Sequence, residues 1–537
     1  MARPLPQLAL LGLVAATFVR ALSGTYVYDD EVVVVRNPAI AAGDLVQVLA
    51  SPFLAAGSPH WRPLTQVLLA LGDRVGGAAA IHALALALHV GATLVAYRLA
   101  RRLLGDARAS FLVALLFALH PAQVESVAWC SALSDVLWGL GALLALDAHV
   151  AARQRGEPGP PWRAVGWFGV ALLAKEQALA IPLLWLLADV FDPAAGARPR
   201  WRRHARALVA LVPWLLLRVA VFGDVGAGFD RVGEPDLGNR PAWLLSFELL
   251  GRLGAVLLLP IAPDAMRSVP VDLDGRGMAY AALGGVALVG LAFARARGPR
   301  PLALGAGIAL VVLAVPALRP AATGEYPIAD RYLYVPAFGL ALALAPLVRA
   351  RGGVALLVAL AAAFAVRSFT AIGAWSDQAA FVRAQLARGA DARVHYMAGQ
   401  LALVDLPPPG RSGERERALQ RARRHFEDAA ASARAPRFGG AESRARLAAD
   451  CAVGLAWCAF LEEELKPRPD FRRPAEMFAA VLAEREAHAP AHVGLAACLA
   501  QIGDRAGAER HLLRALELEP QMMEAHHNLA LLRAGGR

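Results

Sequence analysis

The chain has 537 residues, of which 57% are hydrophobic and only 18% charged, and its mean hydropathy is +0.45. This composition is too apolar for an ordinary soluble protein and places the chain in a membrane. The formal net charge of +11 would suit a nucleic-acid partner. The arginines, however, separate apolar runs and form no continuous basic stripe, so we do not expect the chain to bind nucleic acid. The four cysteines form no CxxC pair and indicate no redox compartment.

The first apolar run, Pro6 to Leu22, is interpreted as an uncleaved span, because no small-residue cleavage site fits a signal peptide. A loop at 23–76 follows, whose first 52 residues carry five acids and three arginines, whereas Arg98 to Arg108 has four arginines and one acid. Since Arg-rich loops stay in the cytoplasm, the long loop is predicted to lie outside and the short one inside.

The next runs are expected to form two hairpins. Ser110 to Val150 is a hairpin with its tip outside, and Ala164 to Asp189 lies between two arginine-rich loops. Since the second run is short for two full crossings of about 20 residues each, it is predicted to be a short hairpin with Lys175 and Glu176 at its tip.

The later runs decide the number of spans. Trp243 to Pro260 lies between two acidic loops, at 224–236 and 264–274, so it is predicted to be re-entrant or interfacial. The other spans are the run at 77–97, between the long outer loop and Arg98, and Ala207 to Phe222, Met278 to Ala294, Leu302 to Leu318, Tyr332 to Leu347 and Val354 to Val366. The prediction is an all-α membrane bundle of eleven spans in residues 1–372 with the C-terminal domain outside, or twelve spans if 243–260 crosses.

Residues 373–537 have a helical period of Ala, Arg, Glu and Leu and mark a second domain. Leu529-Ala530 follows Leu495-Ala496 by 34 residues, the period of a tetratricopeptide repeat. Gly454-Leu455-Ala456-Trp457 resembles another repeat start, interrupted by Lys466-Pro467-Arg468-Pro469. The prediction is a degenerate tetratricopeptide-repeat solenoid of uncertain repeat count, with a generic helical bundle as the alternative.

Three consecutive acids, Asp29, Asp30 and Glu31, follow the first span within about ten residues. Solvated loop charges are the simplest explanation. Carboxylates in this position would also suit a base toward a hydroxyl or a divalent-cation ligand. The residues alone leave both explanations open.

Ionisable residues inside the apolar runs are harder to explain as solvated charges, because charge at membrane depth is costly and usually faces a cavity or a partner. Lys175 is one of only two lysines in the chain, and Asp135 lies within an apolar run. The alternative for Lys175 is a self-satisfied pair with Glu176. His120 and Glu125 flank the tip of the other hairpin and would suit helix-end hydrogen bonds.

Arg331 opens a span from the outer side and offers a forked donor for a phosphate, while Tyr332 and Tyr334 would also suit an interfacial belt. Acids, a lysine and an arginine are therefore predicted to converge on one face. This convergence would suit transfer from a lipid-phosphate donor, with cations holding the phosphate and a carboxylate taking the proton of an acceptor hydroxyl.

The order of these motifs, together with Asn37-Pro38 and Arg62-Pro63-Leu64, resembles the transmembrane-and-tetratricopeptide-repeat protein O-mannosyltransferases of the glycosyltransferase C superfamily. The resemblance implies an inverting enzyme that moves a sugar, typically mannose, from a polyprenyl-phosphate carrier to Ser or Thr of a protein acceptor. It assigns the acidic pair to Asp29 and Asp30. The chain departs from the family at Ser134, where a basic residue often precedes the acid, and at Asp264, whose surrounding pattern is incomplete.

The Arg-rich composition with almost no lysine suggests a bacterial inner membrane with the repeats in the periplasm. The sequence identifies no cofactor, and it leaves open whether a divalent cation binds. The alternatives are transfer of another sugar to lipid or glycan, and a membrane-anchored repeat scaffold without enzymatic activity.

Overall fold

The computed structural model describes residues 5–54, 58, 60–157, 159–191, 201–223, 238–260, 264–320, 325–389, 391–408, 411–434 and 440–534. The acidic loop expected at 224–236 lies wholly outside these residues. The described chain is helical without named strands, and it divides into two compact units within α16 (Gln378–Gly389), between Phe381 and Val382. The expected all-α architecture, a membrane bundle followed by a helical domain, is confirmed.

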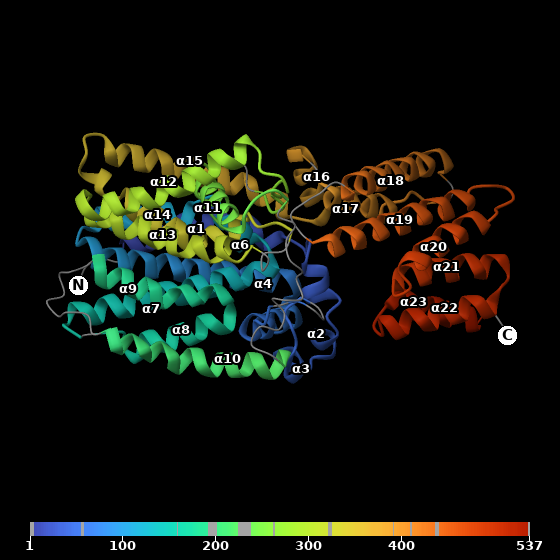
Figure 1. The fold of residues 1–537 in the computed structure, drawn as a ribbon, viewed down its shortest axis with the longest axis horizontal. Coiled ribbons are helices and arrows are strands. Elements are labelled where there is room, and N and C mark those ends of the chain that lie inside the picture. Colours follow the sequence, from blue (N-terminus) through green and yellow to red (C-terminus); the bar gives the residue numbers. More distant parts are fainter. Residues whose placement is uncertain are drawn as a thin grey trace. The chain divides into compact units, whose positions relative to one another are not determined.

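The long helices of the first unit run side by side along one direction (Figure 1). The helices of this unit are α1 (Leu5–Phe18), α2 (Pro38–Ala42), α3 (Leu45–Ala50), α4 (Pro63–Leu104), α5 (Ala107–Leu119), α6 (Gln123–Ala128), α7 (Leu133–Gln154), α8 (Trp162–Ala174), α9 (Ile181–Phe191), α10 (Leu208–Phe222), α11 (Ala242–Leu258), α12 (Gly275–Arg297), α13 (Arg300–Leu318), α14 (Tyr334–Leu344) and α15 (Gly353–Ala371).

Eight helical segments among the described residues are long and apolar enough to cross a membrane. Three predicted spans are shorter: α5 and α8 have 13 residues each and α9 has 11. At 1.5 Å per residue these helices measure about 20 Å or less, against a hydrocarbon core of about 30 Å. The eleven-span count therefore stays a prediction. The hairpin of α8 and α9 turns at Lys175 and Glu176 as expected.

The bundle has two distinct ends. The ends of α4, α7, α9 and α14 line one cavity together with the starts of α5 and α13, so several of the arginine-rich loops meet at one end, here called the basic end. The opposite ends of α4, α7 and α14 carry Arg62, Asp135 and Arg331. We call this opposite end the ion-pair end.

Both ends of α11 contact segments at the ion-pair end. Arg240, just before the helix, donates from Nε to the Val271 carbonyl at 3.1 Å, in the loop that also carries Arg267. At the other end the Nε2 of His120 lies 3.0 Å from the carbonyl oxygen of Leu257. A helix that crossed the bundle would place its ends at opposite faces, so this geometry favours the predicted re-entrant or interfacial placement over a twelfth crossing.

α7 is the central helix of the first unit. In the segment Cys130–Gln154, which contains α7, 83% of the most apolar stretch is buried, against 17% for the segment that contains α10. Residues at the start of α7 can therefore reach groups on several surrounding helices. α4 lies beside α7 and breaks at Gly76 and Gly77, where Gly77 has φ +63° and ψ −149°, a conformation open essentially only to glycine.

The second unit is a series of antiparallel helices. They are α17 (Ala392–Val404), α18 (Ser412–Ala433), α19 (Ala441–Glu463), α20 (Arg472–Glu484), α21 (Ala489–Ile502), α22 (Arg505–Leu518) and α23 (Met523–Ala534). Each contacts the next helix, and the alternate helices α17, α19, α21 and α23 also contact one another in turn. α23 begins 34 residues after α21, as expected from the sequence period, and α22 ends two residues before Pro520.

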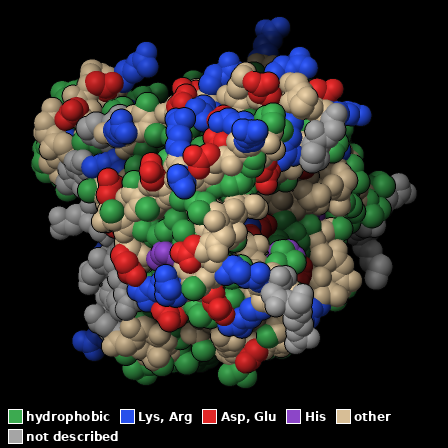
Figure 2. All heavy atoms as spheres, turned by 90° about the vertical axis from the view of Figure 1, so that its right-hand side faces the viewer, with side chains coloured by type: hydrophobic (Ala, Val, Ile, Leu, Met, Phe, Trp, Pro, Cys, Tyr) green, Lys and Arg blue, Asp and Glu red, His purple; other side chains and the backbone are tan. Residues whose placement is uncertain are grey.

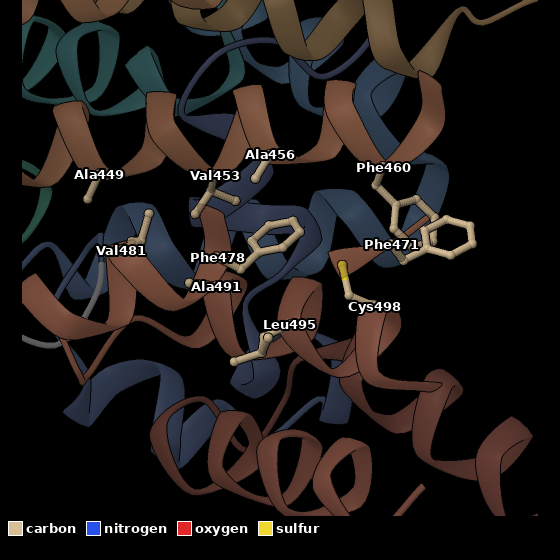
Figure 3. Close-up of a cluster of buried hydrophobic side chains, with 10 residues drawn as sticks. All are labelled: Ala449, Val453, Ala456, Phe460, Phe471, Phe478, Val481, Ala491, Leu495 and Cys498. Atoms are coloured by element: carbon tan, nitrogen blue, oxygen red, sulfur yellow. The ribbon is translucent and has the colours of Figure 1, made fainter. Parts of the chain in front are cut away.

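Small residues let these helices approach closely. A Cβ added to Gly494 would lie 2.2 Å from Cε1 of Phe478, and a Cβ at Gly454 would meet the ring of Phe426. Figure 3 shows the Phe478 ring between α19 and α21, beside Ala456 and Leu495.

On the face drawn in Figure 2, basic and acidic side chains are interspersed, and neither charge sign forms a continuous patch.

The division between the units falls later than the predicted boundary at 372/373. Trp375 and Phe381 explain the difference, because their ring centroids lie 5.0 Å apart and both contact aromatic residues of the first unit. The composition changes near residue 375, but aromatic packing keeps the chain with the bundle as far as Phe381.

Phe478→Ala should lower the free energy of unfolding of the second unit by about 3–5 kcal/mol, because it leaves a cavity beside Gly494. Hydrogen exchange of the α19 and α21 amides in the full chain measures this loss. The neighbouring exposed Glu476→Ala should change stability by less than about 0.5 kcal/mol. Equal exchange in the two variants would contradict this packing.

Candidate active site

The acidic loop after α1 has an unusual backbone conformation at Tyr28. Tyr28 has φ +56°, which is uncommon for a residue with a side chain and frequent at functional sites. Its ring centroid lies 5.6 Å from that of Trp129 and 5.5 Å from that of Phe381, and its amide donates to Oε1 of Gln378 at 2.9 Å. Aromatic contacts therefore fix the residue that precedes the two predicted catalytic acids.

The three acids of this loop have different environments. Asp30 is fully buried, Asp29 is half-buried, and Glu31 is exposed and pairs with Arg36 at 2.7 Å. The explanation of all three as solvated loop charges is therefore wrong for Asp30. It holds for Glu31, whose pair is of the exposed kind that contributes little to stability.

Asp30 is bound on both carboxylate oxygens. Oδ1 accepts from the amide of Ser131 at 2.8 Å and from its hydroxyl at 2.5 Å, and Oδ2 accepts from the amide of Val27 at 3.0 Å. Burial raises the pKa of Asp30 to about 7, and these hydrogen bonds oppose the rise. Asp30 thus ties the acidic loop to the segment just before α7.

Lys175 pairs with Asp135. Its Nζ lies 2.5 Å from Oδ1 of Asp135, and both side chains are buried. The alternative of a self-satisfied pair with adjacent Glu176 is wrong, because Glu176 accepts from Nε of Arg62 at 3.1 Å and from the amide of Trp61 at 3.0 Å. Two neighbouring charges in the sequence therefore belong to two different ion pairs.

Arg331 pairs with Glu125 at the same end of the bundle. Its NH1 lies 2.5 Å from Oε1 of Glu125, and its amide donates to Oε2 at 3.1 Å. The guanidinium carbon also lies 5.5 Å from the ring centroid of Trp129 and 5.1 Å from that of Tyr332. Nζ of Lys175 lies 5.5 Å from the same Tyr332 ring. One aromatic ring therefore contacts both predicted phosphate-binding cations.

The remaining predicted residues have structural contacts. His120 accepts from the Ala122 amide at 3.2 Å and so acts as the expected helix-end hydrogen bonder. The interfacial-belt interpretation of the tyrosines is wrong, because Tyr332 is buried and Tyr334 lies in the interior with its hydroxyl 2.8 Å from Nδ1 of His89. Tyr334 therefore supports the fold of α14 against α4.

Sequence reasoning missed the serines that join these groups. Ser131 binds Asp30, and Ser134 accepts from NH1 of Arg62 at 3.5 Å. Serines in an apolar run carry no distinctive signal, so the sequence alone did not point to these contacts. A further pair, Arg267 with Asp330 at 2.6 Å, was also missed because Arg267 lies in a loop rather than an apolar run.

The candidate site is thus built around residues 129–135. Trp129 contacts Arg331, Ser131 binds Asp30, Ser134 binds Arg62 and Asp135 binds Lys175. Loop acids and cations that are far apart in the sequence converge at the ion-pair end.

The one cluster of three potential metal ligands in the described part of the chain lies in the second unit and consists of His395, His425 and Asp428.

Known relatives of the chain are protein O-mannosyl-transferases. One from Caenorhabditis elegans is 24% identical over 421 residues, which are 73% of this chain and 59% of that protein. One from Drosophila melanogaster is 28% identical over 263 residues, 45% of this chain and 28% of the relative. A mouse protein is 30% identical over 206 residues, 34% of this chain and 22% of the relative.

The resemblance to the protein O-mannosyltransferase family is confirmed. The chain spans less than two thirds of the length of each of these O-mannosyl-transferases. No protein-family model matches the chain.

The pairing of Lys175 with Asp135 can be tested by stability alone. Lys175→Met should destabilise the first unit by about 3–5 kcal/mol, because it leaves Asp135 as an uncompensated buried charge. Adding Asp135→Leu should restore most of this loss, since a buried pair can be replaced by apolar side chains. Thermal unfolding of the purified chain in detergent measures both, and a double variant as unstable as Lys175→Met would contradict the pairing.

Proposed function

We propose that the chain is an inverting membrane glycosyltransferase that moves a sugar, mannose in the first instance, from a polyprenyl-phosphate carrier to Ser or Thr hydroxyls of proteins. The observation that carries the proposal is the convergence of two cations, Lys175 and Arg331, and one acid of the loop, Asp30, on residues 129–135. The names of the relatives support the sugar and the protein acceptor. A repeat scaffold that only needed anchoring would have no use for buried ion pairs at one end of the bundle.

Lys175 and Arg331 are the proposed contacts of the donor phosphate. The ammonium of Lys175 has three N–H donors and Asp135 accepts one of them, while the Arg331 fork meets Glu125 through NH1. Because both cations lie over Tyr332, one phosphate group could contact both. Their positive charge would stabilise the leaving phosphate as the bond to the sugar breaks. The paired acids hold the cations in place before the donor binds.

We propose that three residues stabilise the elements that carry the site: Arg62, Glu176 and His120. Arg62 joins Glu176 to Ser134, and so connects the turn beyond Lys175 to the start of α7. His120 fixes the end of α5, close in sequence to Glu125. None of these three needs to touch the substrates in this mechanism.

Asp29 is the proposed base and Asp30 the residue that positions the loop. Both oxygens of Asp30 are occupied and its side chain is buried, so it is poorly placed to receive an acceptor. Half-buried Asp29 would take the proton of the hydroxyl while the oxygen bonds to the anomeric carbon with inversion. The bond from that carbon to the phosphate oxygen breaks, and polyprenyl phosphate leaves.

Asp29→Asn should reduce transfer by about 10²–10⁴-fold, the usual contribution of a positioned general base. Glu31→Gln is the matched control, because it changes the exposed acid of the same loop and should retain the parent rate. Mass spectrometry of hexose on Ser and Thr of exported proteins, at equal membrane levels of each variant, measures this. Parental transfer by Asp29→Asn would exclude it as base.

The arginine distribution favours a bacterial inner membrane with the ion-pair end and the second unit in the periplasm, where the repeats would hold the protein acceptor. A reporter fused after Arg537 should therefore be active only if it works outside the cytoplasm. Activity of a strictly cytoplasmic reporter at this position would overturn the eleven-span topology. It would also place an even number of crossings before the second unit.

A further inference from the structure

The basic end of the bundle contains a cavity of about 460 Å³ that the proposed reaction does not use. Its cationic lining residues are Arg102, Arg300 and Arg349, and its one acidic lining residue is Asp106. Apolar side chains such as Leu103, Leu304 and Leu342 complete the walls. A mixed lining of this size is typical of a site for a small amphiphilic ligand.

The charges around this cavity are unbalanced. Asp147 already meets two arginines, Arg102 at 2.8 Å and Arg98 at 2.9 Å. Oδ1 of Asp106 accepts from two backbone amides at the start of α5. The Ala109 amide lowers the pKa of Asp106 most strongly, and the positive charge of Arg349 contributes to the same shift, so Arg349 has an acidic neighbour in Asp106. Within the described ranges no ion pair shorter than 4 Å joins Arg300 to an acid. Three arginines therefore line the cavity with one carboxylate, which leaves an excess of positive charge suited to a phosphate group.

The positions of Arg300 and Arg349 indicate where such a phosphate lies. Arg300 is the first residue of one membrane-length helical segment and Arg349 is the last residue of another. Both side chains are therefore expected at the depth of lipid head groups, while Leu304 and Leu342 lie deeper along the same helices. A soluble phosphate would not need these apolar walls, whereas a phospholipid would use the arginines for its head group and the leucines for its chains.

We propose that this cavity binds the phosphate head group of an anionic membrane lipid through Arg300 and Arg349. The site is separate from the ion-pair end, and it does not depend on the proposed sugar transfer. Lipid bound there would join the ends of α4, α13 and α14 and stabilise the bundle.

The test uses the full chain purified in detergent, with phosphatidylglycerol as the lipid probe and phosphatidylcholine as the neutral lipid. Native mass spectrometry measures bound lipid, and thermal unfolding measures stabilisation. Arg300→Gln with Arg349→Gln should weaken phosphatidylglycerol binding about 25-fold, from about fivefold for each arginine. The charge-matched control, Arg297→Gln with Arg351→Gln, removes two arginines that lie within three residues of Arg300 and Arg349 but do not line the cavity, and it should bind like the parent.

Glycerol 3-phosphate provides the soluble arm of the experiment, because it carries the same phosphate without acyl chains. Preferential binding of phosphatidylglycerol, lost in the cavity variant alone, would establish the site. Unchanged binding in the cavity variant, or an equal loss in the control, would overturn it. Stabilisation by glycerol 3-phosphate equal to that by phosphatidylglycerol would overturn the lipid as occupant.

Discussion

The burial of charge around the start of α7 is the constraint on which the rest of the first unit depends. A charge removed from water is stable only when a partner and hydrogen bonds compensate it, and losing one partner costs several kcal/mol. Asp30 and Lys175 find their partners at Ser131 and Asp135, which are four residues apart in the chain. Because α7 is the most deeply buried of the long segments, these contacts fix the surrounding loop and helix ends to a common centre.

The sequence predicted which residues are unusual better than it predicted their partners. Charge inside an apolar run is visible locally, so Lys175, Asp135 and Arg331 could be identified without a structure. Their pairing depends on tertiary packing: Lys175 ignores the adjacent Glu176 and binds Asp135, 40 residues away, and Arg331 binds Glu125, 206 residues away. The role of Ser131 could not be predicted, because it depends on a contact with the buried Asp30 carboxylate that the sequence does not report.

The prediction of the fold also succeeded where local sequence decides the structure and failed where tertiary packing decides it. Long apolar runs predicted the long helices, and the 34-residue period predicted the spacing of α21 and α23. The boundary between the units moved because Trp375 and Phe381 pack on aromatic residues of the bundle, which composition does not report. The two ends of the bundle also differ in their charge balance. Lys175 and Arg331 at the ion-pair end each pair with an acid, whereas three arginines and one acid line the cavity at the basic end.

The central claim is that Asp30 acts through Ser131 to position the loop that carries Asp29. Its most direct test is a double-mutant cycle with Asp30→Asn and Ser131→Ala, measured as the initial rate of mannose transfer from polyprenyl-phosphate mannose to a Ser-containing peptide. If the two residues act as one unit, the double variant should be no slower than the slower single variant. If the two losses multiply, each residue acts independently and this account of the site is contradicted.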